Sequence, residues 1–231
     1  MKLEIIHRTD RMIAINKPHG LLVHRSSIAR DAKHAALQLL RDQIAQRVYP
    51  VHRLDRKTGG VLLFALDREM QALLSSMFME STIKKEYLAI VRGYTAEKET
   101  IDYALKNEQG KTQKAVTRYH RLAQTEIPYA LGKYASQRYS LVCIQPETGR
   151  MHQIRKHFSH IFHPVIGDSS HGCNKQNRFF KHQFSLATMM LHARRLSFQH
   201  PERMEEVVIE AQIHAEFERM IRLLGFQKTL F

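Results

Sequence analysis

Residues 52–66 read HRLDRKTGGVLLFAL, a dense polar segment followed directly by a continuous apolar run. The apolar part, residues 61–66, is typical of a strand buried on both faces, because such a strand needs no polar alternation. The Gly59-Gly60 pair before it permits a turn and a close approach of backbone or ligand. Asp67 can cap a helix that follows, whose apolar residues share one face: Met70, Leu74, Met77 and Phe78. The stretch therefore predicts a turn, a buried strand and a helix in succession.

Working outward, short apolar or alternating segments predict further strands over residues 12–16, 87–91, 116–122, 138–144 and 207–211. Helical spacing predicts a helix after Asp31, one over residues 151–161, and a last one over residues 217–224 that ends at Gly225. Residues 100–114 are polar and indicate a loop or a ragged hairpin. Strands and helices mix without strict alternation, and no linker divides them. We expect an α+β fold, a single domain over residues 1–231 with a largely antiparallel mixed central sheet flanked by helices and loops.

The charge balance indicates a polyanionic partner, most simply a nucleic acid. The chain of 231 residues has 36 Lys and Arg against 22 Asp and Glu, a formal net charge of +14. Small soluble domains usually carry a net charge of about 2–8. The excess lies in two separate blocks, residues 1–60 and residues 147–200. Two basic blocks far apart in sequence suggest two walls that meet on one folded surface.

Several other classes of protein lack their sequence signals here. No stretch of about 18 apolar residues predicts a membrane span, and charges interrupt the start of the chain where a signal peptide needs an apolar core. Two cysteines, Cys143 and Cys173, suit a reducing cytoplasm. The phosphate-binding, dinucleotide-binding and serine-hydrolase motifs GxxxxGK[ST], GxGxxG and GxSxG are missing from the sequence. His152 and His157 are five residues apart rather than four, so we expect no metal site.

Asp55 is the candidate for chemistry in the first polar segment. It is surrounded in sequence by Arg53, Arg56 and Lys57, and nearby cations favour an ionised carboxylate. An ionised carboxylate can act as a nucleophile or an electrostatic partner, but it is a poor general acid. On the charge pattern alone, a surface cluster of ion pairs beside a strand explains the same residues.

A second polar segment covers residues 147–157, ETGRMHQIRKH. Thr148 or Gly149 can start a helix whose N-terminal amides favour an anion such as a phosphate. Arg150, Arg155 and Lys156 add fixed positive charge for contacts with a nucleic-acid backbone. A solvated basic helix without a partner is the alternative that composition leaves open.

These segments together resemble the RluA-type pseudouridine synthases. Residues 52–60 resemble the family motif HRLDRxTSG, with Gly59 in place of the family serine. Residues 16–24 resemble the opening NKPxG…VH motif, residues 85–93 the KxYxAxVxG strand, residues 148–157 the TGRxHQIRxH motif with His163-Pro164 and Gly167-Asp168 after it, and residues 191–201 the closing LHA…HP motif. The five pieces occur in family order. Because these motifs start near residue 16, we expect no separate N-terminal RNA-binding domain.

The resemblance implies roles for particular residues. It implies that Asp55 is the catalytic aspartate, that Tyr87 stacks on the target base and assists proton removal from its C5, and that Arg155 pairs with the catalytic aspartate. Ile154 resembles the apolar residue that packs against the flipped base. The remaining candidates for RNA binding are His52, Arg53, Arg56, Thr58, Arg150, His152 and Gln153. Since uridine must leave its stack to react, Arg56 is our candidate for insertion into the gap or for phosphate binding.

The same resemblance implies a substrate and excludes a cofactor. Isomerising uridine to pseudouridine oxidises nothing and loses nothing, so no cofactor is needed. The agreement with one tRNA-modifying branch of the family implies uridine 65 of tRNA as the substrate. The alternatives are a synthase of this family that acts on ribosomal RNA, or a catalytically silent RNA-binding protein. We expect a cytoplasmic, monomeric enzyme that binds tRNA, with no membrane association.

Overall fold

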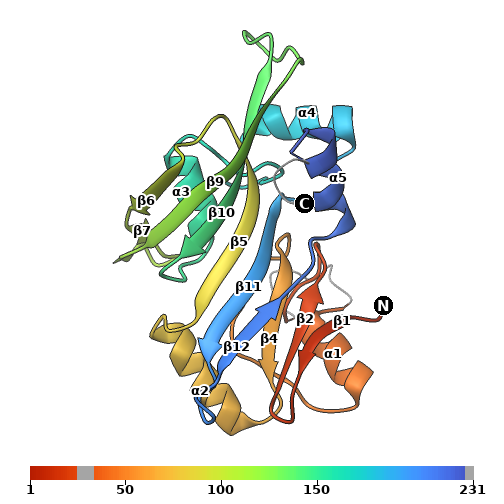
Figure 1. Ribbon diagram of the computed structural model, residues 1–231, viewed down its shortest axis with the longest axis vertical. Helices are drawn as coiled ribbons and strands as arrows, with labels where there is room; N and C mark the ends of the chain where they lie inside the picture. The colour runs from red at the N-terminus through yellow and green to blue at the C-terminus, as the bar shows by residue number, and fades with distance from the viewer. Residues whose placement is uncertain (25–33, 227–231) are drawn as a thin grey trace. The chain divides into compact units, whose positions relative to one another are not determined.

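The computed structural model describes residues 1–24 and 34–226, and their contacts group the chain into two units (Figure 1). The first unit comprises residues 1–85 and 193–212, and the second comprises residues 86–192 and 213–231. Each unit combines a sheet with helices, so the predicted α+β class is confirmed. The single catalytic domain over residues 1–231 stays a prediction.

The sheet of the first unit contains the apolar run on which the sequence analysis centred. β1 (Glu4–Arg8) pairs with β2 (Met12–Lys17), and β2 pairs with β4 (Gly59–Ala65), both antiparallel. The two-residue strand β3 (Tyr49–Pro50) also pairs with β4, and β12 (Glu206–Glu210) pairs with β11 (Leu191–Gln199). All seven residues of β4 are buried. The expectation of a strand covered on both faces is thus confirmed.

Helix α2 (Arg68–Met79) packs on one face of this sheet. Its buried residues Met70 and Leu74 join a cluster that includes Met12 of β2 and Leu63 of β4. The Asp67 side chain accepts a hydrogen bond from the Met70 backbone N–H at 2.8 Å, which confirms the expected N-cap. The helix expected after Asp31 is α1 (Ala36–Ile44); Asp31 itself lies outside the described residues.

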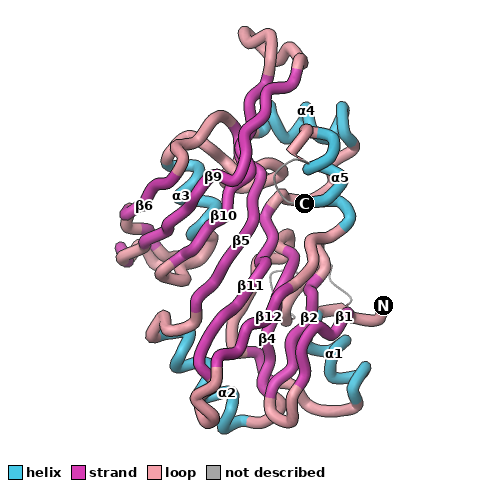
Figure 2. The backbone as a smooth tube through the Cα atoms, viewed as in Figure 1, coloured by secondary structure: helices cyan, strands magenta, loops and turns pink. Residues whose placement is uncertain are grey.

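The second unit contains a sheet in the order β5-β10-β9-β6, antiparallel throughout. β9 (Val116–Ile127) and β10 (Gln137–Pro146) form a long hairpin (Figure 2). β5 (Lys84–Arg92) pairs with β10, and β6 (Lys98–Asp102) pairs with β9. The polar residues 100–114 contain the end of β6 and a small hairpin of β7 (Leu105–Lys106) and β8 (Thr112–Gln113), in agreement with the expected ragged hairpin.

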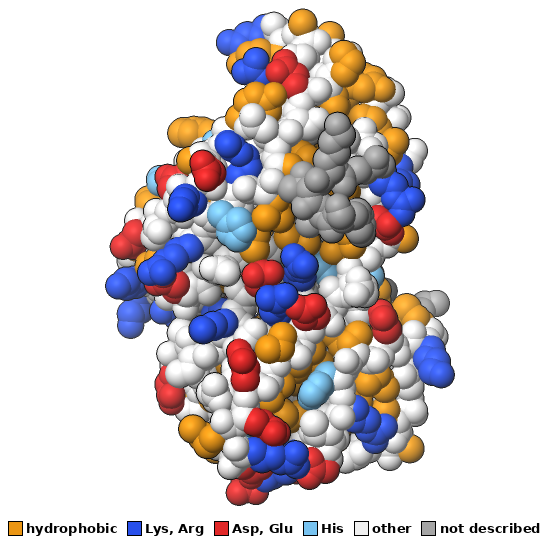
Figure 3. All heavy atoms as spheres, viewed as in Figure 1, with side chains coloured by type: hydrophobic (Ala, Val, Ile, Leu, Met, Phe, Trp, Pro, Cys, Tyr) orange, Lys and Arg blue, Asp and Glu red, His pale blue; other side chains and the backbone are white. Residues whose placement is uncertain are grey.

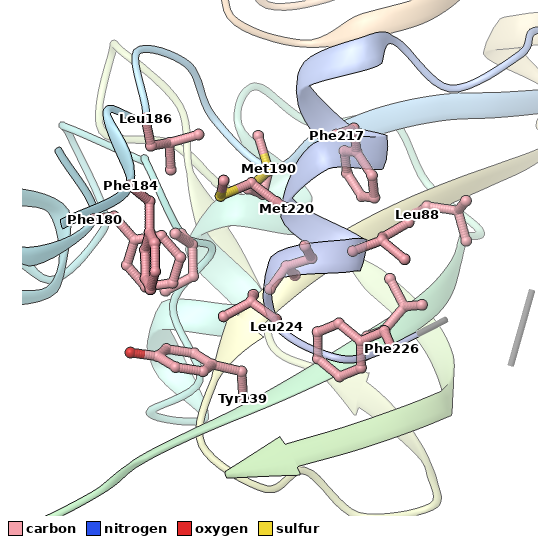
Figure 4. Close-up of a cluster of buried hydrophobic side chains, with 14 of the residues drawn as sticks. Leu88, Tyr139, Phe180, Phe184, Leu186, Met190, Phe217, Met220, Leu224 and Phe226 are labelled. Carbon is pink, nitrogen blue, oxygen red and sulfur yellow. The ribbon is translucent and has the colours of Figure 1, made fainter. Parts of the chain in front are cut away.

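Helices cover both faces of the second unit's sheet. On one face α4 (Asn174–Phe184) and α5 (Ala215–Leu223) pack on Leu88 and Tyr139 (Figure 4). Ala89 and Val142 belong to another hydrophobic cluster, which includes residues of α3 (Gln153–His160). Both are adjacent in sequence to residues that pack against α4 and α5. Because successive side chains of a strand point to opposite faces, α3 lies on the other face. In the part of the chain that the structure describes, no helix is long and apolar enough to cross a membrane.

Candidate active site

Asp55 lies in the loop between β3 and β4 of the first unit. The Thr58 backbone N–H donates to the Asp55 carbonyl at 3.0 Å, which closes a turn over residues 55–58. Asp55 is half-buried and Thr58 is buried, whereas Arg53, Arg56 and Lys57 are exposed. The turn therefore presents a carboxylate among exposed cations, as the sequence pattern predicted.

Hydrogen bonds of backbone and side chains fasten this turn, residues 55–58, to the loop that follows β2. The Gly20 N–H donates to the Arg56 carbonyl at 2.8 Å, and the Arg56 Nε donates to the Gly20 carbonyl at 3.0 Å. His19 Nδ1 lies 2.7 Å from the Lys57 carbonyl oxygen. The NKPxG and HRLDR segments, about 35 residues apart in sequence, thus form one structural piece within the first unit.

Lys17, for which the sequence predicted no role, connects the loop after β2 to the Asp55 turn. Its side chain is fully buried, and Nζ donates to three carbonyl oxygens, those of Pro18 at 3.0 Å, Leu21 at 2.9 Å and Arg56 at 3.2 Å. Burial lowers the pKa of Lys17 to about 7, although the negative charge of Asp55 acts to raise it. The only sequence signal for this role is the lysine within the NKPxG motif.

His52 anchors the start of the loop to the sheet. Its Nε2 accepts a hydrogen bond from the Leu63 N–H at 3.0 Å, and its ring stacks on Phe78 of α2 with centroids 4.5 Å apart. Burial, with a smaller contribution from the charge of Lys85, lowers the pKa of His52 to about 3, so the imidazole is neutral at physiological pH. This geometry gives His52 a positioning role; the sequence analysis had proposed contact with RNA.

Gly60, which precedes the apolar run, cannot be replaced by a larger residue without a steric clash, and its backbone conformation also favours glycine. Gly60 has a φ of +108°, and a Cβ atom there would lie 2.1 Å from the Ala193 carbonyl oxygen. A side chain at this position would push β4 away from β11 within the first unit. The glycine therefore lets the strand that follows the Asp55 turn pack tightly against its neighbour.

Tyr87 and Ile154 both adjoin one apolar cluster of the second unit. Tyr87 is half-buried on β5 opposite Ile144 of β10, and it packs against the cluster that includes Ile154 and Phe158 of α3. The aromatic ring and the apolar side chain that the resemblance assigned to the target base thus share one apolar surface.

Arg155 forms a buried ion pair with Asp168. Its Nε and Nη2 donate to the two carboxylate oxygens at 2.8 and 2.7 Å, and the side chains are 8% and 1% exposed. Asp168 also accepts from the Ser170 and His171 N–H groups. Burial raises the pKa of Asp168, but the hydrogen bonds from Arg155 and these N–H groups outweigh it and hold the pKa below its usual value. Asp168 fixes the guanidinium plane, a role that the Gly167-Asp168 motif did not reveal.

The segment before α3 is ordered by side chains rather than by helical turns. The expectation that Thr148 or Gly149 starts the helix is wrong, because α3 begins at Gln153 after His152, which has a φ of +56°. The Thr148 hydroxyl donates to Gln153 Oε1 at 2.7 Å and accepts from the Val116 N–H at 3.0 Å. No helical N-terminus at residues 148–149 is therefore available for a phosphate.

The side chain of Gln153 is the centre of this hydrogen-bond network. Its Oε1 also accepts from the Arg150 N–H at 3.0 Å, and its Nε2 donates to the Val116 carbonyl and to Thr117 Oγ1, both at 2.9 Å. The side chain is buried, so its hydrogen-bonding groups serve to hold residues 148–153 on β9. Arg150 is exposed beside it, and its Nε donates to the Lys114 carbonyl.

His152 and His171 form a pair within the second unit, with Nδ1 of the first 2.9 Å from Nε2 of the second. Burial and the nearby Arg155 lower the pKa of His171. Because the His171 N–H donates to Asp168, the pair connects His152 to the Arg155 ion pair. The predicted site residues thus form two sets, one in each unit: Asp55 with its turn in the first, and Tyr87, Arg150, His152, Gln153, Ile154 and Arg155 in the second.

Comparison with known proteins points to one family. A family model described as RNA pseudouridylate synthase matches residues 11–160. A Haemophilus ducreyi protein named tRNA pseudouridine synthase C is 47% identical over 100% of this chain and 99% of its own length. A Vibrio parahaemolyticus protein of the same name is 43% identical over 100% and 98%. The solved structure of human RNA Pseudouridylate Synthase Domain Containing 4 has the same fold, with a TM-score of 0.76 and 23% identity over 96% of this chain and 93% of that one.

Proposed function

Because this chain belongs to the RNA pseudouridylate synthase family, we propose that it is a tRNA pseudouridine synthase that isomerises uridine by means of Asp55. The observation that carries the proposal is the similarity, over the full chain, to proteins named tRNA pseudouridine synthase C, at 47% and 43% identity. The turn that presents Asp55 among Arg53, Arg56 and Lys57 supports it.

The reaction rearranges bonds within one nucleotide. The bond between N1 of uracil and C1′ of ribose breaks, the base rotates, and a bond between C5 and C1′ forms; the C5 proton leaves and N1 gains one. Atoms and electrons balance without a cofactor. Asp55 either attacks the nucleotide covalently or assists formation of a glycal intermediate, and both routes use an ionised carboxylate. Lys17 and His52 act behind it by holding the turn that presents Asp55.

Tyr87 and Ile154 receive the uracil in this proposal. They adjoin one apolar cluster, which suits a base that has left its stack, and stacking on an aromatic ring is a usual mode of RNA recognition. Tyr87 also assists removal of the C5 proton. The family resemblance assigns Arg155 as the partner of the catalytic aspartate, and Asp168 fixes the guanidinium plane of Arg155.

The exposed cations of both units bind the RNA backbone. Arg53 and Arg56 beside the turn and Arg150 before α3 are exposed, and cations at such positions neutralise phosphates. Arg56 either binds one of these phosphates or inserts into the gap left by the flipped base. Thr58 shapes the turn, and His152 borders the Arg155 ion pair. The enzyme works in the cytoplasm as a monomer, and its target is uridine 65 of tRNA.

The test is turnover by purified protein on an unmodified tRNA transcript. Wild-type protein should form one pseudouridine, mapped to position 65, whereas Asp55→Asn should bind the tRNA and form none. Thermal unfolding of both proteins serves as the folding control. Wild-type turnover on ribosomal RNA fragments alone would refute the tRNA assignment, and turnover by Asp55→Asn would refute the role of the carboxylate.

A further inference from the structure

Helix α4 of the second unit presents a row of cations to solvent. Lys175, Arg178 and Lys181 are exposed and follow one another at intervals of three residues, so they lie along one side of the helix. The helix contains no acidic residue. Its apolar side, with Phe180 and Phe184, is buried in the cluster shown in Figure 4. One side of α4 thus builds the core, while the other carries only positive charge.

Several arginines elsewhere in the described part of the chain pair with carboxylates, whereas these three cations do not. On the face shown in Figure 3, basic and acidic side chains are interspersed. On α5, for example, Arg219 pairs with Glu216 and Arg222 pairs with Glu218. Within residues 1–24 and 34–226, no ion pair includes any of the three α4 cations. An uncompensated row of charge favours a polyanionic ligand.

The tip of the β9–β10 hairpin lies beside this row (Figure 1). Tyr129 contacts Phe179 and Phe184 with ring centroids 5.6 and 5.8 Å apart, and its hydroxyl accepts from Gln183 at 3.1 Å. A Cβ atom at Gly132 would lie 2.1 Å from the Lys175 Nζ. These contacts hold the tip and α4 together as one surface within the second unit.

The tip adds a fourth cation and an exposed ring. Lys133 Nζ lies 5.3 Å from the ring centroid of Tyr134, and Tyr134 is 54% exposed. A lysine beside an exposed aromatic ring suits a nucleic acid, which offers both phosphates and bases. An acidic protein surface would satisfy the charges but would leave the ring without a base to stack on.

We propose that Lys133, Lys175, Arg178 and Lys181 form a second RNA-binding surface, the α4 surface, which binds backbone phosphates of the tRNA away from the reacting uridine. The proposal rests on the proposed function, since the ligand is that enzyme's substrate. Lys133, Lys175 and Lys181 lie outside the motifs that resemble the family. The surface therefore acts on substrate affinity and leaves the chemical step to the residues described above.

The test neutralises the four cations together as Lys133→Gln, Lys175→Gln, Arg178→Gln and Lys181→Gln. Binding to a tRNA transcript and steady-state turnover are measured over a series of salt concentrations. Because each lost phosphate contact lowers the salt slope of log affinity by about one, the slope should fall by up to about four. We expect KM to rise roughly 10- to 100-fold at moderate salt, with kcat and the melting temperature unchanged.

A matched control removes the same charge from solvent-accessible arginines that already pair with acids: Arg41→Gln, Arg195→Gln, Arg203→Gln and Arg222→Gln. This control should retain most of the affinity and the salt slope. Equal losses in both variants would show that net charge alone matters and would overturn the proposal, as would wild-type affinity and slope in the α4 variant. Wild-type turnover on tRNA is measured alongside, so failure of the α4 surface is distinguishable from failure of the enzymatic assignment.

Discussion

His52 should make the free energy of unfolding fall as the pH is lowered. In the unfolded chain a histidine binds a proton below pH 6.5, whereas burial keeps His52 neutral in the native state down to about pH 3. Over that window the unfolded state therefore binds more protons, and the free energy of unfolding falls as the pH falls. The slope is about 1.4 kcal/mol per pH unit, which amounts to about 2 kcal/mol between pH 6.5 and pH 5.

Urea unfolding of wild type and His52→Gln from pH 8 to pH 5 measures this loss. The glutamine oxygen can accept the hydrogen bond from the Leu63 N–H, but the glutamine does not titrate. The free energy of unfolding of the wild type should therefore fall by about 2 kcal/mol more than that of the variant as the pH falls to 5. His7, His157 and His171 also have lowered pKa values, but both proteins contain them and their effects cancel. Parallel curves for the two proteins would refute the neutral imidazole. At pH 7.5 the variant should keep the wild-type KM for tRNA; a large rise would restore the direct contact with RNA.

Three further perturbations follow from the same contacts. Between pH 7 and pH 10 the Lys17 proton is bound in the unfolded wild type but not in the folded one, so the wild-type free energy of unfolding should rise by about 1.4 kcal/mol per pH unit. Lys17→Met should remove this rise, which urea unfolding across that pH range measures. Asp168→Ala should cost about 3–5 kcal/mol in chemical denaturation because it leaves a buried guanidinium without its carboxylate; a cost below 1 kcal/mol contradicts the ion pair. Gly60→Ala should destabilise the protein by more than 2 kcal/mol, whereas Gly110→Ala, at a positive φ in open space, should cost about 1 kcal/mol; equal melting temperatures would refute the close approach to Ala193.

Local signals predicted the parts of the fold that depend on neighbouring residues. The apolar run 61–66, the Asp67 cap and the glycine that ends the last helix are all present in the structure. Each is decided within a few residues: by continuous hydrophobicity, by a side-chain oxygen at a helix start, or by a positive φ at Gly225.

The elements that escaped prediction depend on tertiary contacts. Helix α4 has few apolar residues and no side-chain cap, and packing of Phe180 and Phe184 in the core stabilises it. β11 contains Arg194-Arg195, which breaks the strand pattern, yet Leu196 and Phe198 are buried in the first unit. Propensity alone does not register such burial.

In the candidate site, too, some residues could be predicted from the sequence, whereas others depend on tertiary contacts. Motif resemblance supplied Asp55, Tyr87 and Arg155, but it did not show which motif residues serve the scaffold. His52 and Gln153 were expected to bind RNA, and their hydrogen bonds instead connect loops to strands. The roles of Lys17 and Asp168 became evident only from burial and geometry, since the Arg56 carbonyl and the Arg155 guanidinium reach them through the fold.

The central claim is that Asp55 turns uridine into pseudouridine in tRNA, and pseudouridine mapping in cells tests it most directly. Cells that lack the gene are complemented with wild type or with Asp55→Asn at equal protein levels, and tRNA and ribosomal RNA are mapped. A pseudouridine at tRNA position 65 should disappear without the gene, return with the wild type and stay absent with Asp55→Asn. Restoration by Asp55→Asn, or a loss confined to ribosomal RNA, would contradict it.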